Sequence, residues 1–268
     1  MPTPPPTGPL CTRDSLADQL RAAGVKSGET LLVHTSLSAL GWVSGGPVAA
    51  VQALLDAVGR TGTLVVPTQS SDNSDPAEWE NPPVPPEWWP EIRASMPAYD
   101  PRTAPTRGVG VLPETVRTWP GAVRSAHPQT SFAAIGPRAT EITEGHALDH
   151  RLGEHSPLAR LEEAHARVLL LGAGYGSCTA FHLAEYRVPG PEEDNSFAVM
   201  TPEGRRWLTV RDRSITDDGF EELGAAFESA TSAVVRGRVG AADVRLFPLA
   251  DAVAYATKWL AEHRPHPR

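Results

Sequence analysis

Cysteine is scarce in this sequence: Cys11 and Cys178 are the only two among 268 residues. Two thiols cannot build a disulfide framework or a four-cysteine zinc site. The tight histidine and cysteine spacings of metalloproteases and zinc fingers are also missing. The composition fits a protein of a reducing compartment, and we expect no metal.

Long apolar runs are missing as well, because no stretch approaches the roughly 18 residues that a membrane-spanning helix needs. The N-terminal "MPTPPPTGPLCTRDSL" is proline-rich and has neither the basic nor the apolar segment of a secretory signal. We therefore expect a soluble, cytoplasmic protein without a membrane partner.

Basic residues are in the minority, with 24 Lys plus Arg against 32 Asp plus Glu and a net charge of −8. A general nucleic-acid binder must neutralise phosphates, so this balance argues against a nucleic-acid partner. It is compatible with a cationic ligand.

Helix and strand patterns alternate along the chain. "TRDSLADQLRAAGV" has Thr12 as a possible cap and apolar residues at helical spacing, while "ETLLVHTSL" and "GTLVVPTQS" are apolar runs typical of buried strands. Segments such as "RWLTVRDRSI" are more typical of antiparallel edge strands. We expect an α/β fold with a mixed central sheet covered by helices. Residues 1–11 should form a flexible tail and residues 12–268 a single domain.

Residues 72–105 differ in composition from the rest of the chain. They hold nine prolines, three tryptophans and many acidic residues, so they cannot form an ordinary helix or central strand. A long irregular insert of this kind is typically functional or disordered, and the tryptophans favour order. We interpret it as a lid or substrate-binding insert suited to a polycation; the alternative is a solvated proline-rich loop.

The stretch "GAGYGS" combines a strand, a glycine turn and a helix, as dinucleotide sites do. Ser177 stands where the fingerprint needs its third glycine, so a tight turn presenting the next helix is the better interpretation. Cys178 and His182, four residues apart, also allow a thiolate and its base; the alternative is a buried thiol beside an unrelated imidazole.

"TAFHLAEYR" places His182 and Glu185 three residues apart on one face of a helix. A buried carboxylate can fix the tautomer of an imidazole and raise its basicity, which favours an acid-base pair. The same spacing also occurs by chance in polar stripes.

"VHTSLSALGWVSGG" joins a strand to a helix through a loop rich in glycine and serine. Its backbone amides, the start of the next helix and the hydroxyls of Thr35, Ser36 and Ser44 could hold a phosphate or an oxyanion. An ordinary connection is the alternative.

Five stretches together resemble the aminoglycoside 3-N-acetyltransferases, a family distinct in fold from the GNAT acetyltransferases. They are "LLVHTSLSALGWVSGG", "GTLVVPTQS", "YDPRTAPTRGVGVLPETVRTWPGAVRSAHPQTSFAAIGPRA", "GEHSPLARL" and "VLLLGAGYGSCTAFHLAEYRVP". The resemblance implies transfer of an acetyl group from acetyl-CoA to the 3-amino group of 2-deoxystreptamine aminoglycosides. It further implies direct transfer without an acetyl-enzyme, and antibiotic resistance as the outcome.

The resemblance also implies roles for individual residues. His182 would be the general base and Glu185 its orienting acid. Independently of the resemblance, the negative charge that develops on the thioester oxygen needs hydrogen-bond donors, and the backbone or hydroxyls near Thr35 and Ser36, or Thr179, are candidates. The implied coenzyme contacts are His34, Thr35, Ser36, Leu37, Gly41, Val43, Ser44, Gly45, Arg107, Gly108, Val109, Gly110, Ser125 and His127. The implied substrate contacts are Asp72, Asn73, Glu78, Tyr99, Asp100 and Glu185.

Other functions remain open at this stage. An acetyltransferase acting on another amine, a non-catalytic aminoglycoside-binding module and a Cys178 hydrolase each fit some of the residues. Either a monomer or a homodimer is compatible with the sequence.

Overall fold

The computed structural model describes residues 8–264, and its centre is a seven-stranded mixed sheet with the order β10-β11-β7-β2-β4-β6-β5. β2 runs parallel to both β4 and β7, and the other pairs are antiparallel. The strands are β2 (Thr30–Thr35), β4 (Thr63–Pro67), β5 (Val123–Arg124), β6 (Phe132–Ile135), β7 (Arg167–Leu171), β10 (Val235–Val239) and β11 (Ala242–Pro248). The expected mixed sheet is confirmed.

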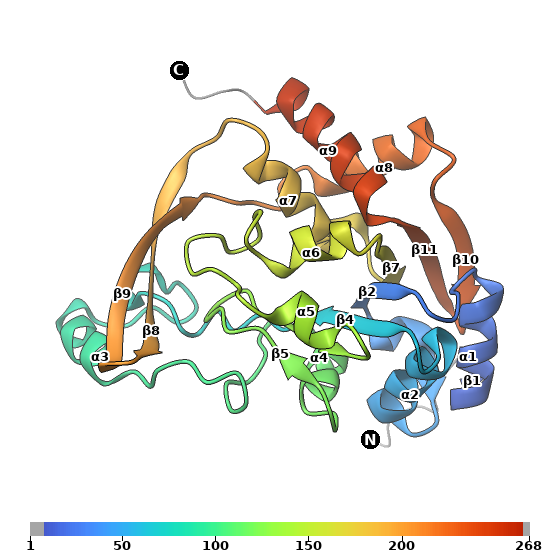
Figure 1. Ribbon diagram of the computed structural model, residues 1–268, viewed down its shortest axis with the longest axis horizontal. Coiled ribbons are helices and arrows are strands. Elements are labelled where there is room, and N and C mark those ends of the chain that lie inside the picture. The colour runs from blue at the N-terminus through green and yellow to red at the C-terminus, as the bar shows by residue number, and fades with distance from the viewer. Residues whose placement is uncertain (1–7, 265–268) are drawn as a thin grey trace, which may run out of the picture.

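Helices cover both faces of this sheet because its central strands are apolar on both sides. Leu31 and Val33 of β2 pack with α1, α2 and α4, whereas Leu32 packs with α5 to α9. Figure 1 shows α1, α2 and α4 below the sheet and α6 to α9 above it. The helices are α1 (Arg13–Ala22), α2 (Gly46–Val58), α3 (Trp89–Ser95), α4 (Val111–Arg117), α5 (Ala139–Thr143), α6 (Pro157–Glu163), α7 (Ala180–Tyr186), α8 (Phe220–Ala230) and α9 (Leu249–His263).

Local sequence signals account for several helix ends. Thr12 caps α1 through a capping box with Ser15, and Ser156 caps α6 with Pro157 in the first turn. α2 begins after Gly45, which adopts a left-handed conformation with φ 87°.

The N-terminal segment differs from expectation. Residues 1–7 of the predicted flexible tail lie outside the described residues, but β1 (Leu10–Cys11) pairs in parallel with β3 (Trp42–Val43). Cys11 is 1% exposed, and its thiol donates to the carbonyl of Leu40 at 3.4 Å. This part of the chain is therefore packed against the loop that follows β2.

A long hairpin of β8 (Glu192–Thr201) and β9 (Gly204–Arg213) stands apart from the central sheet, beside α3 at one end of the molecule (Figure 1). The sequence indicated strand character near β9 but not this separate hairpin. Residues 72–105 pack against it, since the amide of Tyr99 donates to the carbonyl of Ala198 at 2.9 Å. Among the described residues, no helix is both long and apolar enough to span a bilayer.

Candidate active site

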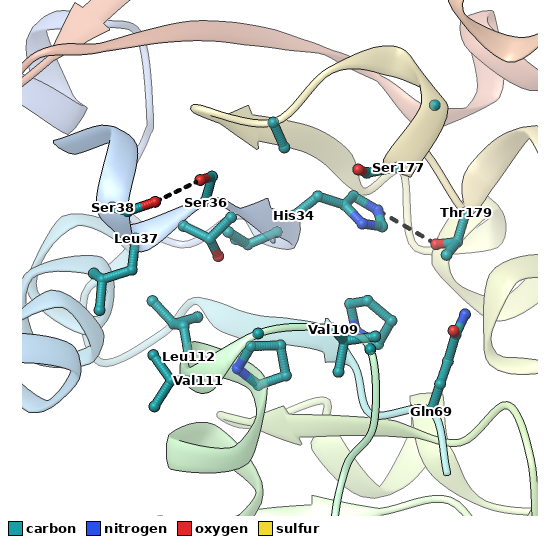
Figure 2. Close-up of a pocket in the computed structure, with 18 of the residues that line it drawn as sticks. His34, Ser36, Leu37, Ser38, Gln69, Val109, Val111, Leu112, Ser177 and Thr179 are labelled. Carbon is teal, nitrogen blue, oxygen red and sulfur yellow. Dashed lines mark hydrogen bonds between the residues drawn. The ribbon is translucent and has the colours of Figure 1, made fainter. Parts of the chain in front are cut away.

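A cavity of about 820 Å³ opens at the carboxyl ends of the three parallel strands. The cavity is lined by residues 34–38 at and beyond the end of β2, and by Pro67 and Gln69 near the end of β4. Ala173, Gly176, Ser177 and Thr179, after β7, complete this side. The opposite wall comes from residues 108–113, at the start of α4 (Figure 2). Open α/β sheets place ligands at this edge, which makes the cavity a candidate binding site.

Glycines keep one wall of this cavity open. Gly108 and Gly110 have φ of +73° and +81°, and a Cβ added to Gly108 would meet no atom within 4 Å. The Thr35 hydroxyl in the same cavity is buried without a hydrogen-bond partner among the described residues. An extended ligand with polar atoms, such as a coenzyme arm, fits these features.

A second cavity of about 450 Å³ adjoins the first. Gln69, His182 and Asp217 line both cavities and so form their junction. Glu78, Glu193 and Asp217 bring carboxylates to the second cavity, and Arg151 brings one cation, which is paired with Glu193 at 2.6 Å. Burial, followed by the nearby charges of Asp75 and Glu193, raises the pKa of Glu78. The second cavity therefore suits a ligand with several positive charges.

His182 and Glu185 form a close pair on α7. Nδ1 of His182 lies 2.5 Å from Oε2 of Glu185, whose side chain is only 2% exposed. Because the carboxylate accepts, Nδ1 carries the hydrogen and Nε2 is left as the basic nitrogen. The other carboxylate oxygen accepts from the Thr216 amide at 3.2 Å and from Arg264.

His34 is a second imidazole in the first cavity. It is 5% exposed, and burial, followed by the charge of His182, lowers its pKa to about 3, so it stays neutral at physiological pH. Its Nε2 lies 3.3 Å from Oγ1 of Thr179, and Figure 2 shows the two side chains facing each other.

The structure brings most of the implied coenzyme contacts together in the first cavity. These are His34, Thr35, Ser36, Leu37, Gly41, Val43, Gly108, Val109 and Gly110. The others, Ser44, Gly45, Arg107, Ser125 and His127, line neither cavity.

Two of those outlying residues belong to a buried hydrogen-bonded cluster. The Ser125 hydroxyl lies 3.0 Å from Nδ1 of His146, and Nδ1 of His127 accepts from the Gln129 amide at 3.1 Å. Burial lowers the pKa of both histidines, that of His146 to about 4. These side chains hold the turn before β6 and do not face either cavity.

The implied substrate contacts are more dispersed. Glu78 lines the second cavity, but Asp72 forms an exposed ion pair with Arg107 at 2.6 Å. Asn73 binds the backbone of Ala198, and the Tyr99 hydroxyl donates to the Ser125 carbonyl at 3.1 Å. Asp100 pairs with Arg102, which lowers its pKa to about 2. Glu185 lies behind His182 and lines neither cavity.

Several lining residues had no part in the sequence prediction. They are Ser38, Gln69, Gln129, Arg151, Ser177, Glu193, Asn195 and Asp217. Gln69 directly follows an apolar strand run, and that position could have identified it. Glu193, Asn195 and Asp217 lie on a hairpin and a loop whose approach to His182 depends on tertiary structure.

The competing interpretations of the glycine turn do not fit the structure. The Gly176 amide donates to the Glu221 carboxylate at 2.7 Å, so an anion of the protein already occupies the place of a phosphate. Cys178 is fully buried, and burial raises its pKa to about 12, which leaves it without thiolate character. Residues 8–264 contain no cluster of three or more His, Cys, Asp or Glu that could hold a metal.

Known proteins match this chain over most of its length. The sequence profile of aminoglycoside 3-N-acetyltransferase matches residues 32–261. The aminoglycoside N(3')-acetyltransferase-like protein YokD of Bacillus subtilis (strain 168), derived from the SPbeta prophage, is 48% identical over 92% of each chain. Aminoglycoside N(3)-acetyltransferase VIII of Streptomyces fradiae is 40% identical over 94% of this chain and 92% of its own.

Solved structures agree with these matches. The crystal structure of YokD superposes with a TM-score of 0.94 at 45% identity, covering 96% of both chains. AAC-IIIb, solved as a binary complex with CoASH, gives 0.84 at 33% identity, covering 97% of this chain and 100% of its own. AAC-VIa bound to sisomicin gives 0.85 at 33% identity, covering 96% and 100%. The resemblance in the sequence is thereby confirmed: the chain belongs to the aminoglycoside 3-N-acetyltransferase family and is an acyltransferase.

Proposed function

We propose that the protein transfers an acetyl group from acetyl-CoA directly to the 3-amino group of a 2-deoxystreptamine aminoglycoside, with His182 as the general base. The observation that carries this proposal is the position of His182, which lines both cavities at their junction. A base between two substrates can act on the amine while the acyl donor lies within reach.

The two cavities differ in the way that the two substrates differ. The first is the larger of the two, is open at its glycines and is lined by hydroxyls, which suits the coenzyme arm; a relative was solved with CoASH. The second carries three carboxylates, which suit the ammonium groups of an aminoglycoside; another relative was solved with sisomicin. We assign acetyl-CoA to the first cavity and the antibiotic to the second.

Proton transfer follows from the tautomer that Glu185 imposes. Acetyl-CoA supplies a thioester: the N–C bond forms as the C–S bond breaks, and coenzyme A leaves as a thiol. Nε2 of His182 accepts the proton of the attacking amine while Nδ1–H remains bound to Glu185. His182 then returns the proton to the leaving sulfur, so no covalent acetyl-enzyme is needed.

Thr179 completes the proposed chemistry. If Nε2–H of His34 donates to Oγ1 of Thr179, the threonine hydrogen is free to donate to the thioester oxygen. His34 can hold this tautomer across the neutral range because burial keeps it uncharged. A donor placed where negative charge develops lowers the barrier.

The test is coenzyme A thiol release, measured with a panel of 2-deoxystreptamine aminoglycosides for the wild type, His182→Ala and the exposed control His155→Ala. We expect thiol release that depends on the drug. The kcat should fall about 10²-fold to 10⁴-fold in His182→Ala, the usual contribution of a general base, and should stay unchanged in His155→Ala. Normal kcat in a folded His182→Ala protein would refute the role of this residue.

The same assay separates the remaining alternatives. Turnover with other amines but with no aminoglycoside would indicate a different acceptor, and drug binding without turnover would indicate a binding module. Mass and NMR analysis of the product locates the acetyl group. Expression in a susceptible bacterium should raise the inhibitory concentration of the accepted drugs if the reaction serves resistance.

A further inference from the structure

An arginine at the end of α9 reaches the carboxylate behind the proposed base. Nη1 of Arg264 donates to Oε1 of Glu185. Its Nη2 donates to the carbonyls of Thr216 and Asp218 at 2.9 and 3.0 Å, and the guanidinium lies 5.7 Å from the ring centroid of Phe220. One side chain thereby joins the C-terminal helix, α7 and the segment before α8.

The contact matters because Glu185 is almost fully buried. Its side chain is 2% exposed, and a buried carboxylate is costly unless it is paired and hydrogen-bonded. Oε2 is bound to His182, while Oε1 has the Thr216 amide and Arg264. Arg264 is therefore the permanent cation beside this carboxylate.

We propose that Arg264 is a positioning residue for the reaction. It binds one oxygen of Glu185 and leaves the other for His182, so that the imidazole keeps its orientation at the junction of the two cavities. This inference rests on the proposed function, since it assigns Arg264 a role through the general base.

Arg187, at the end of the helix that carries His182 and Glu185, offers a control arginine. It lies directly after α7, and its side chain is 28% exposed like that of Arg264. It binds two carboxylates, Glu154 and Glu162, where Arg264 binds one carboxylate and two carbonyls. Neither it nor its partners line a cavity. A purely structural arginine should thus behave like Arg187.

The experiment compares Arg264→Ala, Arg264→Lys and Arg187→Ala. We expect kcat of Arg264→Ala to fall about 10-fold to 100-fold, by analogy with the loss seen when the groups behind a metal-binding histidine are removed. The KM for acetyl-CoA should stay near the wild-type value. Lysine should restore part of kcat, and millimolar methylguanidinium should raise kcat of Arg264→Ala. Arg187→Ala should lose thermal stability without losing kcat.

A double-mutant cycle tests whether Arg264 acts through Glu185. In a Glu185→Ala background, Arg264→Ala should cost little further kcat, because the group it positions is gone. Three results would each overturn the proposal. They are a kcat loss in the double variant equal to the product of the two single losses, a wild-type kcat in folded Arg264→Ala, and an effect on KM alone.

A spectroscopic measurement keeps this inference separate from the proposed function. The Nδ1–H proton of His182 should give a far-downfield NMR resonance, identified by its absence in His182→Gln. Arg264→Ala should shift or broaden that resonance and Arg187→Ala should not, whether or not any aminoglycoside is turned over. An unchanged resonance overturns the positioning role; absence of turnover in the wild type overturns the proposed function alone.

Discussion

At the scale of single residues, neighbouring positions on one short segment differ in reactivity because they face different surroundings. Cys178 and His182 are one helical turn apart, yet the thiol is fully buried while the imidazole reaches both cavities. Desolvation opposes the thiolate, whereas Nδ1 of the imidazole is hydrogen-bonded to the Glu185 carboxylate. Environment, more than residue type, separates the structural group from the reactive one.

The two thiols should therefore be inert in the folded protein. Burial raises the pKa of both Cys11 and Cys178, so a chromogenic disulfide reagent should detect neither before denaturation and both after it. Cys178→Ala should keep kcat and lose some stability through the small cavity it leaves. Rapid reaction of Cys178 in the native protein, or loss of turnover in this variant, would restore the hydrolase hypothesis.

At the scale of elements, the hairpin of β8 and β9 depends on residues far away in the sequence. The Asn73 amide binds both polar backbone groups of Ala198, as acceptor from its N–H and donor to its C=O, each at 2.9 Å. The hairpin carries Glu193 and Asn195, which line the second cavity. Asn73 thus acts on the site through the position of the hairpin.

Asn73→Ala should weaken binding in the second cavity only. Losing both bonds should cost about 1–3 kcal/mol of hairpin docking. We expect the KM for the aminoglycoside to rise about 10-fold, the factor that corresponds to about 1.4 kcal/mol. The KM for acetyl-CoA should not change. Asp72→Ala, which removes only an exposed ion pair, is the adjacent control; an equal effect in both variants would contradict this account.

Elements with a strong local pattern were predictable from the sequence. The candidate site was predicted at one edge of the sheet. The signals were the apolar runs at β2, β4 and β7, the glycine turn before α7 and the spacing of His182 and Glu185. Contacts that depend on distant segments were not predictable: Arg264 follows Glu185 by 79 positions, and nothing in "EHRPHPR" indicates that it meets a buried carboxylate. Ser125 and His127 show the opposite case, where a polar motif serves a buried turn.

At the scale of the whole molecule, three of the histidines within residues 8–264 are buried in the neutral form. His34, His127 and His146 are each at most 5% exposed, and burial is the first cause of the lowered pKa of all three. In the unfolded chain they titrate near the ordinary value of about 6.5. Below that pH, the unfolded chain therefore binds three protons that the folded protein does not bind.

The free energy of unfolding should consequently fall as the solution is acidified from about pH 6.5 toward pH 5. A lowered histidine pKa gives stability that is fully present above the unfolded value and lost below it, at up to about 1.4 kcal/mol per pH unit for each group. Carboxylates such as Glu114, whose pKa Arg117 lowers to about 2, act only at more acid pH.

Urea unfolding of the wild type and His146→Gln at several pH values tests this origin of acid sensitivity. Glutamine can still bond to the Ser125 hydroxyl and the Arg151 carbonyl but does not titrate. Between pH 6.5 and 5, the free energy of unfolding of the variant should change with pH about one third less steeply than that of the wild type. The reason is that one of the three histidines that stay unprotonated in the folded protein has been removed. An unchanged slope would mean that His146 does not resist protonation, and the acid loss in this range would have to come from other groups, such as His34 and His127.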